Sequence, residues 1–196
     1  AEAEAGIVSR EAGADELYRR TGIADCNATC PISKLLWIKK HAPNLYTAAS
    51  RFLLVEDYLI LRLTGRFVSE KSVMSTTGYY DIYHDALWTE LLEALGLDPG
   101  KLPETLDCGE EAGTVLPSVA AELGLSPRAL VVTAAMDQIA STLGAGNVAD
   151  GIITETTGTV LAIAATCGKE SLCADKHVTV YKHALPGKYL YLPICM

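Results

Sequence analysis

The sequence predicts an α/β protein with a largely helical first part and a mixed α/β sheet layer in its last part. Helical patterns with capping residues dominate as far as about residue 96, whereas short β-branched runs alternate with glycine turns from Ala129 onward. One helical segment interrupts those runs, and the order strand, helix, strand, strand indicates a sheet layer with a helix on it. Residues 97–113, with two prolines and three glycines, are the best candidate for a connection between structural units.

Two helices are predicted near the start of the chain. The first covers residues 2–21, is rich in Ala and Glu, and closes at Gly22, which suits a helix C-cap. The second surrounds Trp37, where Ser33 can form the N-cap and Pro43 ends the helix. The spacing of caps and breakers therefore divides residues 1–43 into two helical segments.

Two more helices and a loop are predicted before the connection. Residues 52–63 (FLLVEDYLILRL) are apolar on more than one face and predict a buried helix, stopped by Thr64 and Gly65. Residues 69–83 are rich in Ser, Thr, Gly and Tyr, which predicts a loop leading into a strand. A short helix follows over residues 88–96.

The last part of the chain predicts five strands and one helix. The helix runs from Gln138 to about Ala145. The last strand reaches Met196 without a closing element and no strand precedes the first helix, so we expect both ends to continue in a longer protein. The strand candidates are ALVVTAAM (129–136), GIITETT (151–157), VLAIAAT (160–166), VTVYKHA (178–184) and KYLYLPI (188–194).

Composition excludes several classes of protein. The formal net charge of -8 and the absence of any dense Lys/Arg block argue against binding to nucleic acid or to an anionic membrane. The apolar runs are shorter than the roughly 20 residues that cross a bilayer, and the first residues lack the features of a secretion signal. A cytoplasmic protein is expected.

Six cysteines without a C-x-x-C pair, and four scattered histidines, predict structural or free thiols and no metal site.

Asp137 is the first candidate site residue, because it follows a predicted strand and begins a predicted helix. It can be an N-cap, whose carboxylate accepts backbone N–H bonds. It can also act as a base, because a carboxylate at the carboxyl end of a strand in an open α/β sheet faces the ligand crevice and can take a proton from a hydroxyl. Gln138 beside it can hydrogen-bond the same substrate or be an exposed residue of the first turn.

The second candidate is the turn Thr157, Gly158 and Thr159 between two predicted strands. A tight turn explains it, but backbone N–H groups and hydroxyls there also suit phosphate oxygens. Neither a dinucleotide fingerprint nor a P-loop is found, since the GAG at 144–146 closes a helix instead of opening one. Tyr79, Tyr80 and Tyr83 with Asp81 favour strand packing over a carbohydrate platform, and no motif for nucleophilic catalysis is present.

Four segments of the chain carry a shared pattern: KLLWIKKHAPNLY (34–46), LLVEDYLILRLTG (53–65), SVMSTTGYYDIYHDALWTELLEALGL (72–97) and TAAMDQIASTLGAGNVADGIITETTGTV (133–160). In this order they resemble the FGGY family of carbohydrate kinases. The third segment matches the family's order of S-x-x-S, an Asp, a Trp and L-L-x-x-x-G-L. The fourth segment matches the run of an Asp, G-x-G, a Gly and G-T that opens the family's second domain.

This resemblance implies an actin/hexokinase-like fold of two RNase H-like domains around a cleft for sugar and Mg-ATP. Residues 1–112 would be the later, largely helical part of the sugar-binding domain, and residues 113–196 the first part of the nucleotide-binding domain, with a mixed sheet. It also implies that Asp137 is the general base, that Gln138 touches the sugar, and that Gly158 and Thr159, with Thr157, face the nucleotide phosphates.

Other parts of the family pattern would lie outside these residues. The D-x-G-T phosphate loop would precede Ala1 and the adenosine-binding half would follow Met196, while Ala134 and Ala135 stand where many members have a glycine. We therefore expect the middle of an ATP- and Mg²⁺-dependent sugar kinase, acting on a ketopentose such as xylulose and inactive as an isolated piece. The rival is a catalytically silent module that keeps the scaffold and forms a homodimer through exposed sheet edges.

Overall fold

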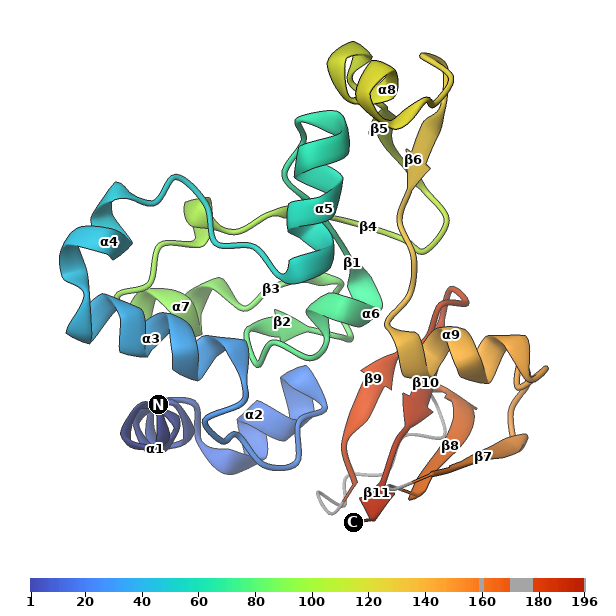
Figure 1. Ribbon diagram of the computed structural model, residues 1–196. Coiled ribbons are helices and arrows are strands. Elements are labelled where there is room, and N and C mark those ends of the chain that lie inside the picture. Colours follow the sequence, from blue (N-terminus) through green and yellow to red (C-terminus); the bar gives the residue numbers. More distant parts are fainter. Residues whose placement is uncertain (159–160, 170–177, 196) are drawn as a thin grey trace.

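The computed structural model describes residues 1–158, 161–169 and 178–195, and places a helical region beside a β-sheet (Figure 1). The helical region occupies the first hundred residues, and the sheet with its helix occupies the last sixty. A small two-stranded unit lies between them in sequence and projects at one end of the molecule (Figure 1). The α/β class predicted from the sequence is confirmed, and no described helix is long and apolar enough to cross a membrane.

The first predicted helix is two helices, α1 (Glu2–Ala12) and α2 (Ala14–Thr21). Gly13 separates them with a φ of 73°, a left-handed conformation that a helix interior does not accept. The single helix predicted over residues 2–21 is therefore wrong. The predicted C-cap at Gly22 is confirmed, since Gly22 is left-handed and its N–H donates to the carbonyl of Tyr18.

The next two helices, α3 (Pro31–His41) and α4 (Pro43–Ala48), each begin with a proline. Proline favours the first helical position, because its fixed φ suits the helix and its missing N–H would have no partner there. The N-cap of α3 is consequently Cys30, so the predicted cap at Ser33 is wrong. Ser33 lies inside the helix and is fully buried.

Helix α5 (Val55–Thr64) is closed by a left-handed Gly65, as predicted, but it is not a buried helix. Only Asp57 and Ile60 are buried, whereas Val55 is 77% exposed and Tyr58 49% exposed. The helix packs with one face on the two-stranded unit and leaves the other face open, which sequence hydrophobicity alone does not distinguish.

The predicted loop over residues 69–83 contains regular structure. Strand β1 (Val68–Glu70) leads into the single-turn helix α6 (Lys71–Met74), followed by the hairpin β2 (Tyr80–Asp81) and β3 (Ala86–Leu87) and by α7 (Thr89–Ala94). The carboxylate of Glu70 caps α6 by accepting the N–H groups of Ser72 and Val73. A helix of one turn is too short to show a periodic apolar pattern, so the sequence did not predict α6. The side-chain cap from Glu70 stabilises its first turn.

The segment predicted as a connection contains the 3₁₀ turn η1 (Pro99–Lys101) and two strands. Strand β4 (Glu104–Leu106) pairs with β1 in parallel, and β5 (Glu111–Thr114) pairs with β6 (Leu130–Val132) around helix α8 (Pro117–Leu123). Ala112 of β5 joins Ile60 and Val68 in one buried cluster. The boundary proposed between residues 112 and 113 therefore lies inside a strand that packs on α5.

The last part forms a sheet covered by one helix. Its described strands pair in the order β11-β8-β10-β9, β7 also pairs with β8, and all of these pairs are antiparallel. The only parallel pair among the described strands is β1 with β4. The elements are α9 (Asp137–Gly144), β7 (Ile153–Thr157), β8 (Leu161–Gly168), β9 (Val180–Lys182), β10 (Lys188–Tyr191) and β11 (Ile194–Cys195).

The two faces of this sheet contact different partners. Along β10, Tyr189 belongs to the large core of the helical region, while its neighbour Leu190 belongs to a smaller cluster with Ile139 of α9. Along β8, Cys167 and Ala164 divide in the same way. Because successive side chains of a strand point to opposite faces, the sheet lies between α9 and the helical region.

Candidate active site

Asp137 is the first residue of α9, and its side chain is exposed. Its Oδ1 accepts the N–H of Gln138 at 2.7 Å. The N-cap is Met136, so the prediction that Asp137 is the N-cap is wrong by one residue. The carboxylate still lies in the first turn, where the helix dipole favours negative charge.

The backbone just before Asp137 is fixed to the helical region. Met136 donates its N–H to Ser72 Oγ of α6 at 3.0 Å, and Ile139 is fully buried against the sheet. The start of α9 therefore has one backbone contact with α6 and one side-chain anchor below it. These two contacts hold the exposed carboxylate of Asp137 in a defined place.

Ser72 is in turn oriented by Glu70. The hydroxyl of Ser72 donates to Glu70 Oε2, which also accepts the N–H groups of Ser72 at 2.8 Å and Val73 at 3.1 Å. Burial raises the pKa of Glu70, and the bonds from Ser72 and Val73 partly offset that effect. Sequence reasoning missed both residues, although Ser72 begins the S-x-x-S segment that supported the family resemblance.

Gln138 follows Asp137 and is half-buried. Its backbone carbonyl accepts the hydroxyl of Thr142 at 2.7 Å, within the helix. Within the described part of the chain, its side-chain amide has no hydrogen-bond partner. An amide in that state can donate to and accept from a polar ligand beside Asp137.

Strands β7 and β8 pair antiparallel with Thr157 opposite Leu161, so the chain reverses between them as the predicted turn requires. Thr157 and Gly158 are exposed, and the hydroxyl of Thr157 donates to Glu155 Oε1 at 2.6 Å. The predicted phosphate contact at Thr159 lies outside the described residues.

Asp137 and the hairpin turn belong to the same helix-and-sheet unit but do not touch. No hydrogen bond or ion pair between described residues joins Asp137 or Gln138 to Thr157 or Gly158. In Figure 1 β7 ends near β11, whereas α9 begins beside β9 and β10. Both groups are exposed, so both are accessible from solvent.

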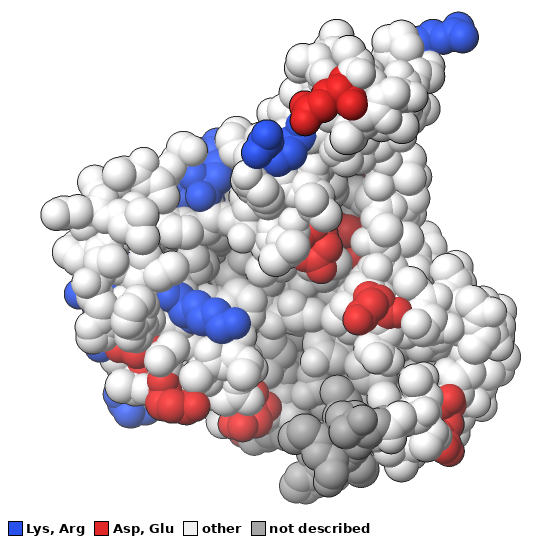
Figure 2. Space-filling view, in the orientation of Figure 1, with Lys and Arg blue, Asp and Glu red and all other residues white. Residues whose placement is uncertain are grey.

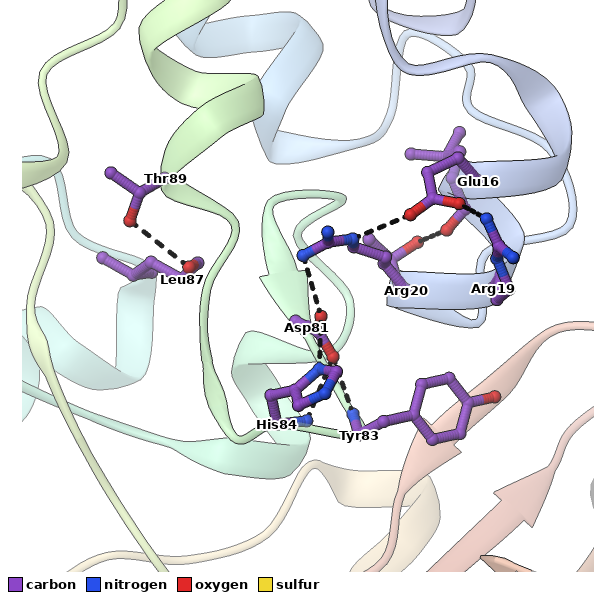
Figure 3. A network of polar contacts seen from close by, with 10 residues as sticks. Glu16, Arg19, Arg20, Asp81, Tyr83, His84, Leu87 and Thr89 are labelled. Carbon is purple, nitrogen blue, oxygen red and sulfur yellow. Dashed lines mark hydrogen bonds and ion pairs between the residues drawn. The ribbon is translucent and has the colours of Figure 1, made fainter.

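The tyrosine cluster is part of the core and not a carbohydrate platform, since Tyr79 and Tyr80 are buried. Asp81, which follows them, organises a turn: its Oδ1 accepts the N–H groups of Tyr83 and His84 at 3.0 Å, and its Oδ2 lies 2.9 Å from His84 Nδ1 (Figure 3). Arg20 of α2 reaches the same Oδ2 at 3.4 Å. This network fastens α2 to the β2–β3 hairpin.

A cavity of about 430 Å³ lies elsewhere, between the α2–α3 loop and β9. Polar side chains dominate its lining, and Asp137 is not among them. The lining includes Asp25, Asn27, Thr29, Cys30, Thr179 and Tyr181.

The described residues contain no cluster of three His, Cys, Asp or Glu side chains placed to hold a metal ion. Figure 2 shows acidic and basic side chains in small groups around a hollowed face, without one basic block.

Comparison with known proteins places these features in one family. The model of the FGGY family of carbohydrate kinases, N-terminal domain, matches residues 1–144. The xylulose kinase of Haemophilus influenzae is 27% identical over 157 residues, which are 78% of this chain and 31% of that relative. The gluconokinase of Bacillus subtilis is 26% identical over 182 residues, covering 93% of this chain and 35% of that relative. The chain thus spans about a third of the length of these curated relatives.

Solved structures agree on the fold. The xylulose kinase of Rhodospirillum rubrum superimposes with a TM-score of 0.89 at 24% identity, covering 98% of this chain and 39% of that one. The glycerol kinase of Plasmodium falciparum with ADP gives 0.82 at 17% identity, covering 95% of this chain and 39% of that one. The fold is thus the actin/hexokinase-like fold of the sugar kinases. The chain belongs to the FGGY family of carbohydrate kinases.

Proposed function

We propose that these residues form part of an ATP-dependent sugar kinase, which transfers the terminal phosphoryl group of ATP to a sugar hydroxyl. The observation that carries the proposal is the exposed carboxylate of Asp137, held at the start of α9 by the bond from Met136 to Ser72. A carboxylate fixed in this way can accept the proton of a bound hydroxyl while leaving space for the substrate.

Gln138 and Asp137 would bind the sugar together. The side-chain amide of Gln138 has no partner in the described residues, so a sugar hydroxyl can satisfy it without displacing a protein contact. Asp137 then serves as the general base on the reacting hydroxyl. A general base contributes typically about 10² to 10⁴-fold, so positioning and charge neutralisation must supply the rest of the catalysis.

The hairpin turn would hold the phosphates of ATP. Thr157 and Gly158 are exposed, and their backbone N–H groups and the Thr157 hydroxyl suit phosphate oxygens, while glycine allows close approach of the backbone. We propose that Thr159 takes part in the same contact. Mg²⁺ would enter with the nucleotide, bound mainly by phosphate oxygens and water. When bound, it neutralises charge on the phosphates.

The substrate class we propose is a ketopentose such as xylulose. Support comes from the xylulose kinases among the relatives, including that of Streptomyces rubiginosus, which is 34% identical over 140 residues covering 71% of this chain and 28% of that relative. Because the reaction consumes ATP, we propose a cytoplasmic location. A homodimer is a further proposal.

A rival function, a silent binding or assembly module, is favoured for the 196-residue chain by its exposed apolar side chains. Val55, Leu130 and Ile153 are all strongly exposed. Such surfaces favour association with another protein surface. We therefore expect the 196-residue chain by itself to show no sugar-dependent ATP hydrolysis and to form assemblies.

The test is Asp137→Asn in the complete kinase, assayed with ATP and a panel of ketopentoses and polyols. We expect kcat to fall at least about 10²-fold with little change in ATP binding, because only the proton acceptor is removed. Asp15→Asn is the matched control, since Asp15 is also an exposed acid in the first turn of an eight-residue helix. Unchanged turnover in Asp137→Asn would overturn the role of Asp137. Tight binding of Mg-ATP to the 196-residue chain, seen by calorimetry, would contradict its expected inactivity.

A further inference from the structure

Between α2 and α3, Cys30 ends a short turn that is closed on Asn27, and Cys26 directly precedes that turn. The N–H of Cys30 donates to the carbonyl of Asn27 at 3.2 Å, and Asn27 Oδ1 accepts both the N–H and the hydroxyl of Thr29, at 2.9 and 2.6 Å. Both cysteines are free thiols and both are buried. The turn therefore places two reduced sulfurs in one neighbourhood of the core.

The two thiols differ in acidity. The neighbouring Cys26 thiol lowers the pKa of Cys30, against the effects of burial and Asp25, and Lys34 lowers it further. The Cys30 thiol, together with burial, raises the pKa of Cys26. Cys30 is also the N-cap of α3, an eleven-residue helix whose dipole favours a thiolate. Of the two thiols, Cys30 is thus the one that loses its proton more readily and the better nucleophile.

The two thiols also differ in access. Cys30 lines the cavity of about 430 Å³ between the α2–α3 loop and β9, together with polar residues such as Thr76 and Thr179. The sulfur of Cys26 instead lies 3.7 Å from the hydroxyl of Ser33 inside α3. A small polar oxidant that enters the cavity therefore meets Cys30 first.

We propose that Cys26 and Cys30 form a peroxide-reactive thiol pair that closes to a disulfide. The Cys30 thiolate attacks one oxygen of a hydroperoxide, the O–O bond breaks, and Cys30 becomes a sulfenic acid while water or an alcohol leaves. The Cys26 sulfur then attacks the Cys30 sulfur, the S–O bond breaks and water leaves. Two thiols lose two electrons and two protons, which reduce the peroxide. In a reducing compartment such a bond is transient and suits redox sensing.

The pair lies where the helical region meets the sheet. Val180 of β9 donates its N–H to the carbonyl of Gly22 at 2.9 Å, and the N–H of Ala24 donates to Thr179 Oγ1 at 3.3 Å. A disulfide would constrain the loop that makes these contacts. The proposal does not depend on Asp137 or on kinase activity.

The test uses the 196-residue chain and hydrogen peroxide at neutral pH. Trypsin cleaves after Arg20 and Lys34, and the resulting peptide contains both cysteines of the pair and no other. We expect this peptide to lose the mass of two hydrogen atoms after peroxide and to regain it after reduction. In Cys26→Ser, a diketone trap should label Cys30 as a sulfenic acid, whereas Cys30→Ser should leave Cys26 unlabelled.

Cys108→Ser is the matched control, because Cys108 is a half-buried thiol whose pKa is raised by burial. It should leave closure of the pair unchanged, and Cys108 itself should oxidise roughly tenfold more slowly than Cys30, as expected for a thiol with less thiolate. A folded wild-type chain whose peptide 21–34 stays reduced would overturn the proposal. Equal labelling of Cys26 and Cys30 in the two single variants would also overturn it.

Discussion

The helical region and the sheet obtain their buried cores in different ways. The helical region packs helices and the β2–β3 hairpin on one another in a large cluster that includes Leu92 and Tyr80. The sheet has only a small cluster under α9, and its other face, with Val180 and Tyr189, completes the core of the helical region. One face of the sheet is therefore buried by the helical region and the other by α9.

The largest expected effect comes from breaking the helical core itself. Leu92→Ala should lower the free energy of unfolding by about 2–5 kcal/mol, because Leu92 is fully buried and its removal leaves a cavity. Leu123→Ala, at a helical leucine that is 56% exposed, is the control and should change it by about 0.5 kcal/mol or less. Urea unfolding of both variants measures the difference, and equal losses would contradict the comparison.

The next test separates a junction glycine from a surface glycine. Gly22→Ala would place a Cβ 2.2 Å from the carbonyl oxygen of Val180, whereas Gly124→Ala meets nothing within 4 Å. Both glycines have a positive φ, which costs alanine about 1–2 kcal/mol. The clash should add about 1–3 kcal/mol to Gly22→Ala alone, since backbone must move. Similar thermal stability of the two variants would contradict close packing of the Val180 carbonyl of the sheet against Gly22.

A smaller effect is expected at Ser72, which joins α6 to the start of α9. Ser72→Ala leaves the N–H of Met136 without its acceptor and should cost about 1–3 kcal/mol. Hydrogen exchange at the Met136 amide should accelerate in this variant, while Ser72→Thr, which keeps the hydroxyl, should restore protection. Ser118→Ala, at an exposed serine of α8, should leave that amide unchanged. Unaltered exchange in Ser72→Ala would refute the role of this contact.

The smallest effects concern pH and have opposite signs at two buried carboxylates. The hydrogen bond from Lys40 lowers the pKa of Glu4. The contribution of Glu4 to the free energy of unfolding is therefore present at pH values above the ordinary glutamate pKa, and it is lost as pH falls through the lowered pKa. Burial raises the pKa of Glu70. The contribution of Glu70 to the free energy of unfolding is therefore present at pH values below the ordinary glutamate pKa, and it is lost as pH rises through the raised pKa.

The variants Glu4→Gln and Glu70→Gln should show this opposition. As pH rises through the lowered pKa of Glu4 toward the ordinary value of 4.5, the cost of Glu4→Gln relative to wild type should grow. As pH rises from 4.5 through the raised pKa of Glu70, the cost of Glu70→Gln should shrink. Unfolding free energies measured across this range check the prediction. Parallel slopes for the two variants would disprove it.

Much of the local structure could be predicted from the sequence. The stops at Gly22 and Gly65, the start of a helix at Asp137 and the turn at Gly158 depend on residues within a few positions of one another. The N-cap at Cys30 was missed because Ser33, three residues later, is an alternative cap. The break at Gly13 was missed because the Ala- and Glu-rich pattern continues beyond it as far as Gly22. For the candidate site, the sequence proposed Asp137 and Gln138 but neither Ser72, which contacts the start of α9 from more than sixty residues away, nor Glu70, which orients Ser72.

By itself, the sequence determined which family's motifs these residues carry and where glycine and proline end or begin the helices, because those signals depend on local φ angles and on hydrogen bonds within a turn. The tertiary structure decided which faces are buried: α5 is half exposed, and each side of the sheet has its own partner. It also decided that Met136 binds Ser72 and that Cys30 lines a cavity. Such contacts join segments distant in the chain, so their energy depends on how the elements pack and not on the neighbours of any one residue.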